Sequence, residues 1–173
     1  MLQRTERQER LYELLKTSQE PVTGTDIAST MGVTRQVVVH DIALLRASGA
    51  PILSTPRGYM LQTQDLPEDK YVLSVSHPPQ LTATELTILV DYGIKVRDVL
   101  VEHPLYGEIR GSLHIASRRD VDLFMHQLRD LGANLLSSLT DGYHLHTVEC
   151  SDPKRLAEAI QDLRKNGIKV FED

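Results

Sequence analysis

Two histidines, His144 and His146, lie one residue apart in a segment that has the alternating pattern of a β-strand. Side chains at positions i and i+2 of a strand project from the same face, so both imidazole rings are expected to point in one direction. Neutral imidazole binds zinc, nickel, iron and copper, and two histidines on one strand are a common first half of a divalent-metal site. An exposed strand face that carries two histidines is the alternative interpretation of this spacing.

Two residues upstream offer further ligands for the same ion. His77 stands at the end of another expected strand, before Pro78-Pro79, and Glu85 lies early in the helix that follows. Each has an alternative role, because His77 could simply end its strand and Glu85 could form a capping box with Thr82. Spacing alone does not decide whether the three imidazoles and the carboxylate meet.

A second group of residues has the side-chain types that contact nucleic acid. Arg35 and Gln36 stand at the start of an expected helix that Thr34 can cap. Their side chains can make the paired hydrogen bonds that guanine and adenine edges offer in the major groove. His40 follows one turn later, and Arg57 lies in an expected hairpin tip from which it could reach a phosphate or the minor groove.

The elements expected around these residues form a helix-turn-helix followed by a small hairpin. Apolar spacing and turn residues predict three helices and two short β-type stretches, at residues 3–17, 24–31, 35–48, 52–53 and 59–61. A three-helix interaction bundle with an ordinary solvated face is the alternative.

The rest of the chain alternates strand and helix patterns. We predict strands at 71–76, around 113–115, at 135–139, 143–150 and 168–171, and helices at 82–101, 118–132 and 152–166. Thr140-Asp141-Gly142 is a strong hairpin-turn sequence between two of these strands. The predicted order is β-α-β-α-β-β-α-β, and the fold class is α+β: a helix-turn-helix unit, then an α/β sandwich with helices on one face of a mixed or antiparallel sheet.

Length and composition indicate a globular protein. The chain has 173 residues, of which 40% are hydrophobic. It contains no apolar run long enough to span a bilayer and begins with a polar segment rather than a secretory signal, so we expect a cytoplasmic protein. The single cysteine, Cys150, excludes internal disulfides and multi-cysteine metal sites, and we expect it to be a small buried residue.

Charge is distributed unevenly between two predicted domains. The whole chain carries a formal net charge of −5; residues 1–64 hold seven basic and six acidic side chains, a net charge of +1, and the remainder carries −6. The net charge of residues 1–64 is therefore compatible with binding to the phosphates of nucleic acid. The polar stretch that includes Pro67 suggests a linker at 65–69, between a DNA-binding domain at 1–64 and a regulatory domain at 70–173.

The third predicted helix resembles the recognition helix of the winged helix-turn-helix in bacterial repressors. In those proteins a serine or threonine followed by arginine opens the helix, as Thr34-Arg35 does here, and Asp41-Ile42 continues it. The resemblance implies the roles of five residues: base contacts by Arg35, Gln36 and His40, a DNA-backbone contact by Arg46, and a place in the wing for Arg57.

Nearly the whole chain resembles the niacin-responsive transcriptional repressors, whose regulatory part is called the three-histidine (3H) domain. The likeness is carried by His77-Pro78, Thr84-Glu85-Leu86, 103–107, 113–119 and 141–146. It implies that one divalent transition metal per subunit, nickel, zinc or a similar ion, is held by His77, Glu85, His144 and His146. It further implies a homodimer that binds a double-stranded DNA operator with nicotinic acid as corepressor and represses genes of niacin uptake or NAD synthesis.

Four further residues are candidates for contact with the effector. His103 and Tyr106 belong to a loop that could line its pocket, while Arg118 and Arg119 could meet the nicotinate carboxylate. A plain connecting loop and solvated first-turn arginines are the alternatives. Two other functions are alternatives. A three-histidine, one-carboxylate site could belong to a metal-dependent hydrolase, which would use a metal-bound water. The C-terminal part could also be a plain dimerisation module fused to the DNA-binding domain.

Overall fold

The computed structural model describes residues 3–62 and 70–171, and the predicted linker at 65–69 lies outside them. The chain divides into two compact units, Met1–Gln64 and Asp65–Asp173. Among the described residues, no helix combines the length and the apolar character needed to cross a bilayer.

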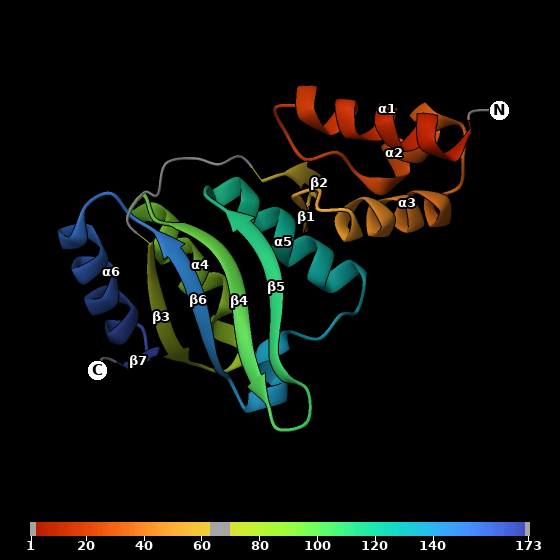
Figure 1. Ribbon diagram of the computed structural model, residues 1–173. Helices are drawn as coiled ribbons and strands as arrows, with labels where there is room; N and C mark the ends of the chain where they lie inside the picture. The colour runs from red at the N-terminus through yellow and green to blue at the C-terminus, as the bar shows by residue number, and fades with distance from the viewer. Residues whose placement is uncertain (1–2, 63–69, 172–173) are drawn as a thin grey trace. The chain divides into compact units, whose positions relative to one another are not determined.

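The first unit consists of three helices and a two-stranded hairpin (Figure 1). Its elements are α1 (Arg4–Thr17), α2 (Gly24–Met31), α3 (Arg35–Ala47), β1 (Ile52–Thr55) and β2 (Gly58–Leu61). Thr34 caps α3 as predicted, because its hydroxyl accepts a hydrogen bond from the Val37 N–H. The predicted helix-turn-helix with a hairpin, or wing, is confirmed.

Helix α3 is held from inside the unit. Val38 and Ile42 are buried with Leu11 of α1 and Ile27 of α2 in one apolar core. On the side of α1, Arg7 pairs with the buried Asp41 carboxylate, with Nε 2.6 Å from Oδ2. Burial alone would raise the pKa of Asp41, but the hydrogen bonds and charge of Arg7 outweigh it and hold that pKa below its usual value.

The second unit is a five-stranded antiparallel sheet with helices packed on one face. Its strands are β3 (Lys70–Ser76), β4 (Lys95–His103), β5 (Gly107–Ile115), β6 (Tyr143–Glu149) and β7 (Lys169–Phe171), in the order β5-β4-β6-β3-β7. Its helices are α4 (Thr82–Asp91), α5 (Arg118–Asp130) and α6 (Pro153–Lys165). The predicted α+β class is confirmed, with an antiparallel sheet.

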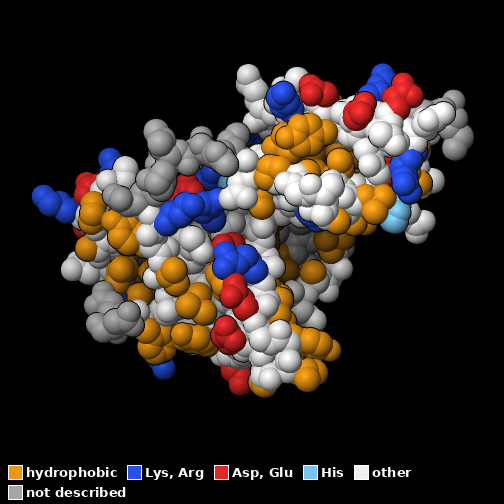
Figure 2. Space-filling view, viewed as in Figure 1, with side chains coloured by type: hydrophobic (Ala, Val, Ile, Leu, Met, Phe, Trp, Pro, Cys, Tyr) orange, Lys and Arg blue, Asp and Glu red, His pale blue; other side chains and the backbone are white. Residues whose placement is uncertain are grey.

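The core of this unit lies between the sheet and the three helices. Val75 and Val148 from the sheet are buried with Leu89 of α4, Val121 of α5 and Leu163 of α6. Within the described part of this unit no helix packs on the opposite face of the sheet (Figure 1), and Figure 2 shows hydrophobic and charged side chains side by side on it. Cys150 is buried at the edge of the same core, as predicted.

The helix predicted over 82–101 is wrong in its second half. Helix α4 ends at Asp91, and residues 95–103 form strand β4. Gly93 is the cause: at φ 74 it donates its N–H to the Val90 carbonyl while the Ile94 N–H bonds the Leu89 carbonyl. This pair of hydrogen bonds is a Schellman ending, in which the glycine adopts a left-handed conformation.

The strand predicted over 135–139 is also wrong. Leu136–Thr140 forms a short 3-10 helix, η2, so that the turn at 140–142 joins η2 to β6 rather than two strands. Ser138 donates from both its N–H and its hydroxyl to the Leu135 carbonyl. Such local serine hydrogen bonds compete with strand pairing. The order of the second unit is therefore β-α-β-β-α-β-α-β.

Candidate metal centre and nucleic-acid interface

The register of the sheet places His144 and His146 on the face that α4 covers. His144 lies opposite Val75 and His146 opposite Leu73, and both valine and leucine belong to the apolar core. The two histidines are each only 3% exposed. The alternative of an exposed strand face with two histidines is therefore excluded.

His77 and Glu85 meet these rings from two other elements. His77 follows the last residue of β3, and Glu85 lies on the buried face of α4. Ligand atoms of His77, Glu85 and His144 all lie within 4.8 Å of one another. His146 joins them, with Nε2 2.7 Å from Glu85 Oε1. We call these four residues the histidine–glutamate cluster.

The alternative role of Glu85 in a capping box does not hold. The N-cap of α4 is Leu81, which makes no side-chain capping hydrogen bond. The Glu85 carboxylate is turned into the cluster, and within the described part of the chain the Thr82 hydroxyl has no hydrogen-bond partner.

Each imidazole ring is fixed by a backbone carbonyl. The Nδ1 atom of His77 lies 2.8 Å from the Pro78 oxygen, that of His144 2.8 Å from the Gly142 oxygen, and that of His146 2.7 Å from the Asp98 oxygen. Because a carbonyl oxygen can only accept, Nδ1 carries the hydrogen in all three rings. In the neutral rings the remaining nitrogen, Nε2, is then an acceptor.

All three Nε2 atoms converge on the Glu85 carboxylate, which also only accepts. His77 Nε2 and His144 Nε2 both contact Oε2, the latter at 3.2 Å. Glu85 Oε1 and His146 Nε2 are buried and, although close, make no hydrogen bond of acceptable geometry. Acceptors arranged in this way require positive charge between them, as protons on Nε2 or as a metal ion. Three imidazole nitrogens and one carboxylate suit a divalent first-row ion.

The same geometry shifts the pKa values of Glu85, His77 and His146. Burial alone would raise the pKa of the Glu85 carboxyl, but the three histidines outweigh it and hold that pKa well below its usual value. Burial also opposes charge on His77 and His146, yet the adjacent carboxylate raises the pKa of both imidazoles. The cluster therefore favours bound positive charge.

Asp98 is a residue of the site that sequence analysis missed. Its backbone oxygen fixes the His146 ring, while its buried carboxylate accepts from the Thr147 N–H at 2.8 Å and pairs with Arg110 at 2.7 Å. The pairing of β4 with both neighbours is irregular beside Asp98, which frees these groups from the regular ladder. Asp98 reaches the cluster because residues 95–103 form a strand. The sequence analysis predicted a helix over 82–101, so it could not identify Asp98 as part of the site.

Gly142 is the second missed residue, although its turn was recognised. It has φ 94, and a Cβ atom there would lie 2.5 Å from the His77 carbonyl oxygen. Its own oxygen accepts from His144 Nδ1 and from the His77 N–H. A side chain at this position would push apart the segments that carry two of the histidines.

The candidate effector residues fall into two separate groups. His103 and Tyr106 lie together in the β4–β5 turn, with ring centroids 5.0 Å apart. Arg118 and Arg119 begin α5 at the other end of β5, and Arg118 pairs with Asp91 at 2.7 Å. The nine residues of β5 span roughly 30 Å at about 3.3 Å per residue, so the two groups of one chain do not line the same small-molecule pocket.

The sheet register shows which group is nearer to the cluster. Leu100 of β4 pairs with Leu145, so the β4–β5 turn lies at the end of the sheet where β6 begins. His144 and His77 lie at that same end. Residues 103–107 are therefore the group on the cluster's side.

The first unit presents an exposed surface at the start of α3. Arg35, Gln36 and His40 are all exposed there, in the first turns of the second helix of the helix-turn-helix. This is the part of the motif that lies against base edges in the major groove.

Arg46, predicted to contact the DNA backbone, and Arg57, predicted to lie in the wing, both make contacts within the unit. Arg46 donates to the Ile52 carbonyl at 3.0 Å and to the Ser54 hydroxyl at 2.6 Å, and thus joins α3 to β1. Arg57 lies at the hairpin turn, 3.7 Å from a Glu20 carboxylate oxygen.

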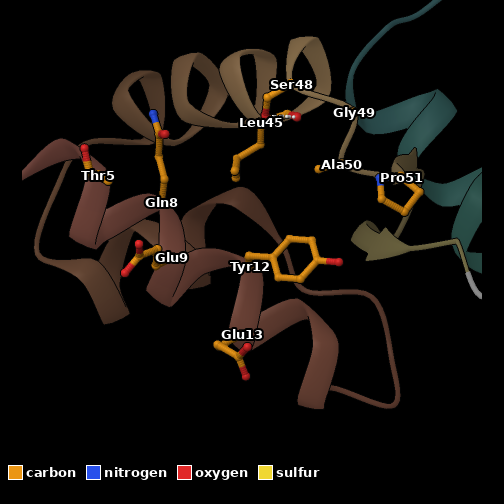
Figure 3. Close-up of a pocket in the computed structure, with 10 residues that line it drawn as sticks. All are labelled: Thr5, Gln8, Glu9, Tyr12, Glu13, Leu45, Ser48, Gly49, Ala50 and Pro51. Atoms are coloured by element: carbon orange, nitrogen blue, oxygen red, sulfur yellow. Dashed lines mark hydrogen bonds between the residues drawn. The ribbon is translucent and has the colours of Figure 1, made fainter.

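A shallow groove lies elsewhere on the first unit, between α1 and the C-terminal end of α3 (Figure 3). Figure 3 shows Glu9, Tyr12 and Glu13 of α1 along one side and Leu45 on the other. Its two carboxylates oppose contact with phosphates, so the groove does not extend the DNA-binding surface.

These features define a DNA-binding protein of the helix-turn-helix class with a second domain that holds a buried histidine–glutamate cluster. Residues 7–60 match an HTH domain model and residues 70–172 match a 3H domain model. The chain is 37% identical over 167 residues to the transcription repressor NadR of Bacillus subtilis, covering 95% of this chain and 93% of that protein. It is 39% identical over 175 residues to NiaR of Thermotoga maritima, described as a probable transcription repressor, covering 99% of each. The chain belongs to this NadR/NiaR family of HTH–3H transcription repressors.

Proposed function

We propose that the protein is a cytoplasmic homodimeric repressor that binds a double-stranded DNA operator with nicotinic acid as corepressor, and that it controls genes of niacin uptake or NAD synthesis. A divalent ion such as nickel or zinc is held by His77, Glu85, His144 and His146. The observation that carries this proposal is the convergence of three carbonyl-anchored imidazoles on one buried carboxylate. The exposed Arg35, Gln36 and His40 supply the DNA contacts.

The chemistry of the cluster suits nicotinic acid. A bound first-row ion supplies a Lewis-acidic position for the pyridine nitrogen of the effector. The carboxylate of the effector needs a separate hydrogen-bond donor, and nicotinamide, which lacks that negative charge, is discriminated there. We assign this contact to residues 103–107 rather than to Arg118 and Arg119, because the β4–β5 turn lies at the cluster's end of the sheet.

The experiment compares operator binding by fluorescence anisotropy for chelated and nickel-loaded protein, each with nicotinic acid or nicotinamide. We expect nicotinic acid to tighten binding only in the loaded protein, and nicotinamide to have little effect. A ligand can favour operator binding only if it binds better to the conformation that matches DNA. Metal analysis is expected to give about one ion per subunit, since residues 3–62 and 70–171 hold one such cluster.

Two variants complete the design. His144→Ala/His146→Ala is expected to lose both the ion and the response, whereas His126→Ala, which removes an exposed histidine of α5 outside the cluster, is expected to keep both. Nicotinic acid that still tightens operator binding of the metal-free protein would show that the ion has only a structural role.

A further inference from the structure

Thr82 is a buried polar residue whose hydroxyl has no role in the contacts described above. The residue is 6% exposed, and within residues 3–62 and 70–171 its hydroxyl makes no hydrogen bond. A buried hydroxyl without a partner is destabilising, so most such groups in native proteins bond to another group or to ordered water.

The helix places Thr82 one turn before Glu85 on the same buried face of α4. Helical side chains lean toward the N-terminus, so Glu85 covers the turn that precedes its own Cα, which is where Thr82 lies. Thr82 and Glu85 therefore lie on the same side of the helix, near its N-terminus.

The usual local partner for this hydroxyl is already engaged. Threonine in a helix commonly donates to the carbonyl four residues before it, which here belongs to Pro78. That oxygen accepts instead from His77 Nδ1 at 2.8 Å and from the Leu81 N–H at 3.0 Å. The hydroxyl is thus left without its usual helical partner.

We propose that the Thr82 hydroxyl hydrogen-bonds a water molecule that is a further ligand of the cation held by the cluster. This rests on the metal site of the proposed function. An ion with four protein ligands can expand its coordination to take a further ligand, which is water when no effector nitrogen is bound there. A buried water needs two to four polar partners. Thr82 is then a positioning residue that holds the non-protein ligand.

The test uses full-length Thr82→Val, which keeps the shape and removes the hydroxyl, beside Thr82→Ser, which keeps the hydroxyl. Thr87→Val, at a half-buried position of the same helix, is the matched control. Nickel affinity is measured by competition with a chelator, and the ligand field by the visible spectrum of cobalt(II)-loaded protein.

Thr82→Val is expected to bind nickel about 10-fold more weakly, the lower range for loss of an outer partner of a metal site, and to change the cobalt spectrum. Thr82→Ser and Thr87→Val are expected to match the parent protein. The melting temperature of metal-free Thr82→Val is expected to stay equal or rise, because an unpartnered hydroxyl is lost. That readout separates a loss of the water contact from a loss of folding.

Unchanged nickel affinity and an unchanged cobalt spectrum in Thr82→Val would overturn the role of Thr82 and leave the metal site standing. A parent protein that binds neither ion would overturn both. If Thr82→Val does not fold, Thr82→Ala is measured against Thr82→Ser by the same two readouts, with the same expected difference.

Discussion

At the scale of single residues, three backbone carbonyls fix the imidazoles through their Nδ1 atoms, so the rings are oriented by the fold itself. A site whose ligands are already oriented loses little conformational freedom when an ion binds. Its remaining cost is electrostatic, because neutral rings and an ionised Glu85 must share a buried space. In the proposed metal site, protons and a metal ion would therefore compete for one position.

This competition predicts how metal-free protein responds to pH. The pKa values of His77 and His146 are raised on folding, so their contribution is fully present below about pH 6.5 and is lost as the pH rises through the raised values. The pKa of Glu85 is lowered, so its contribution is present above about pH 4.5 and is lost as the pH falls through the lowered value. We expect the stabilisation by added nickel, measured as a shift in melting temperature, to grow from pH 5.5 to pH 8.

A control separates the cluster from His114, which also titrates. Burial and the nearby Lys95 and Arg97 lower the pKa of His114 to about 4, so its contribution is lost as the pH falls from about 6.5 toward 4. His114 has φ 52, a conformation that asparagine tolerates well, so His114→Asn removes the titration without new backbone strain. A nickel effect that is independent of pH in this variant would contradict proton–metal competition.

At the scale of elements, the sequence predicted correctly those helices and strands that are specified by local signals such as caps and alternating apolar residues. Thr34 as a cap and the strand alternation around His144 and His146 led to the right elements. The helix over 82–101 failed because the apolar run continues past Gly93, whose left-handed ending was not recognised. Once β4 was taken for a helix, the contact between Asp98 and His146 could not be foreseen, because it joins residues 48 apart through a backbone oxygen.

The contacts of α3 predict two different outcomes for two arginines. Arg35 is exposed at the first turn, so Arg35→Ala is expected to cost about 1–3 kcal/mol of operator affinity and to relax the preference at one base pair. Arg46 joins α3 to the wing through Ile52 and Ser54, so Arg46→Ala is expected to weaken binding to all sequences alike. Competition assays with single-base operator variants measure both effects.

The opposite pattern would reassign these residues. If Arg46→Ala changed the preference at one base pair while Arg35→Ala weakened all sequences equally, the recognition helix would lie in the groove in a different orientation. Melting temperatures of both variants provide the control, because Arg46 also contributes contacts within the unit.

At the scale of the whole molecule, the distribution of charge along the chain favours DNA binding by the first unit. The first 64 residues carry +1 and the rest carries −6, so phosphates are attracted mainly to the helix-turn-helix unit. A dimer of such units is expected to protect a pseudo-palindromic duplex with half-site centres one helical turn, about 34–36 Å, or a multiple of it apart. DNA footprinting measures the spacing, and protection of one asymmetric half-site would contradict the dimer.

The ligands of the cluster come from segments at very different distances along the chain. His77 and Glu85 are 8 residues apart, whereas Glu85 and His144 are 59 residues apart, with β4, β5 and α5 between them. Closing the longer loop costs more chain entropy, and contacts between distant residues tend to form late in folding. A nascent or refolding chain therefore has only half of the site until β6 pairs with β3. For the proposed metal site, tight binding of an ion is therefore expected only in a chain that has finished folding.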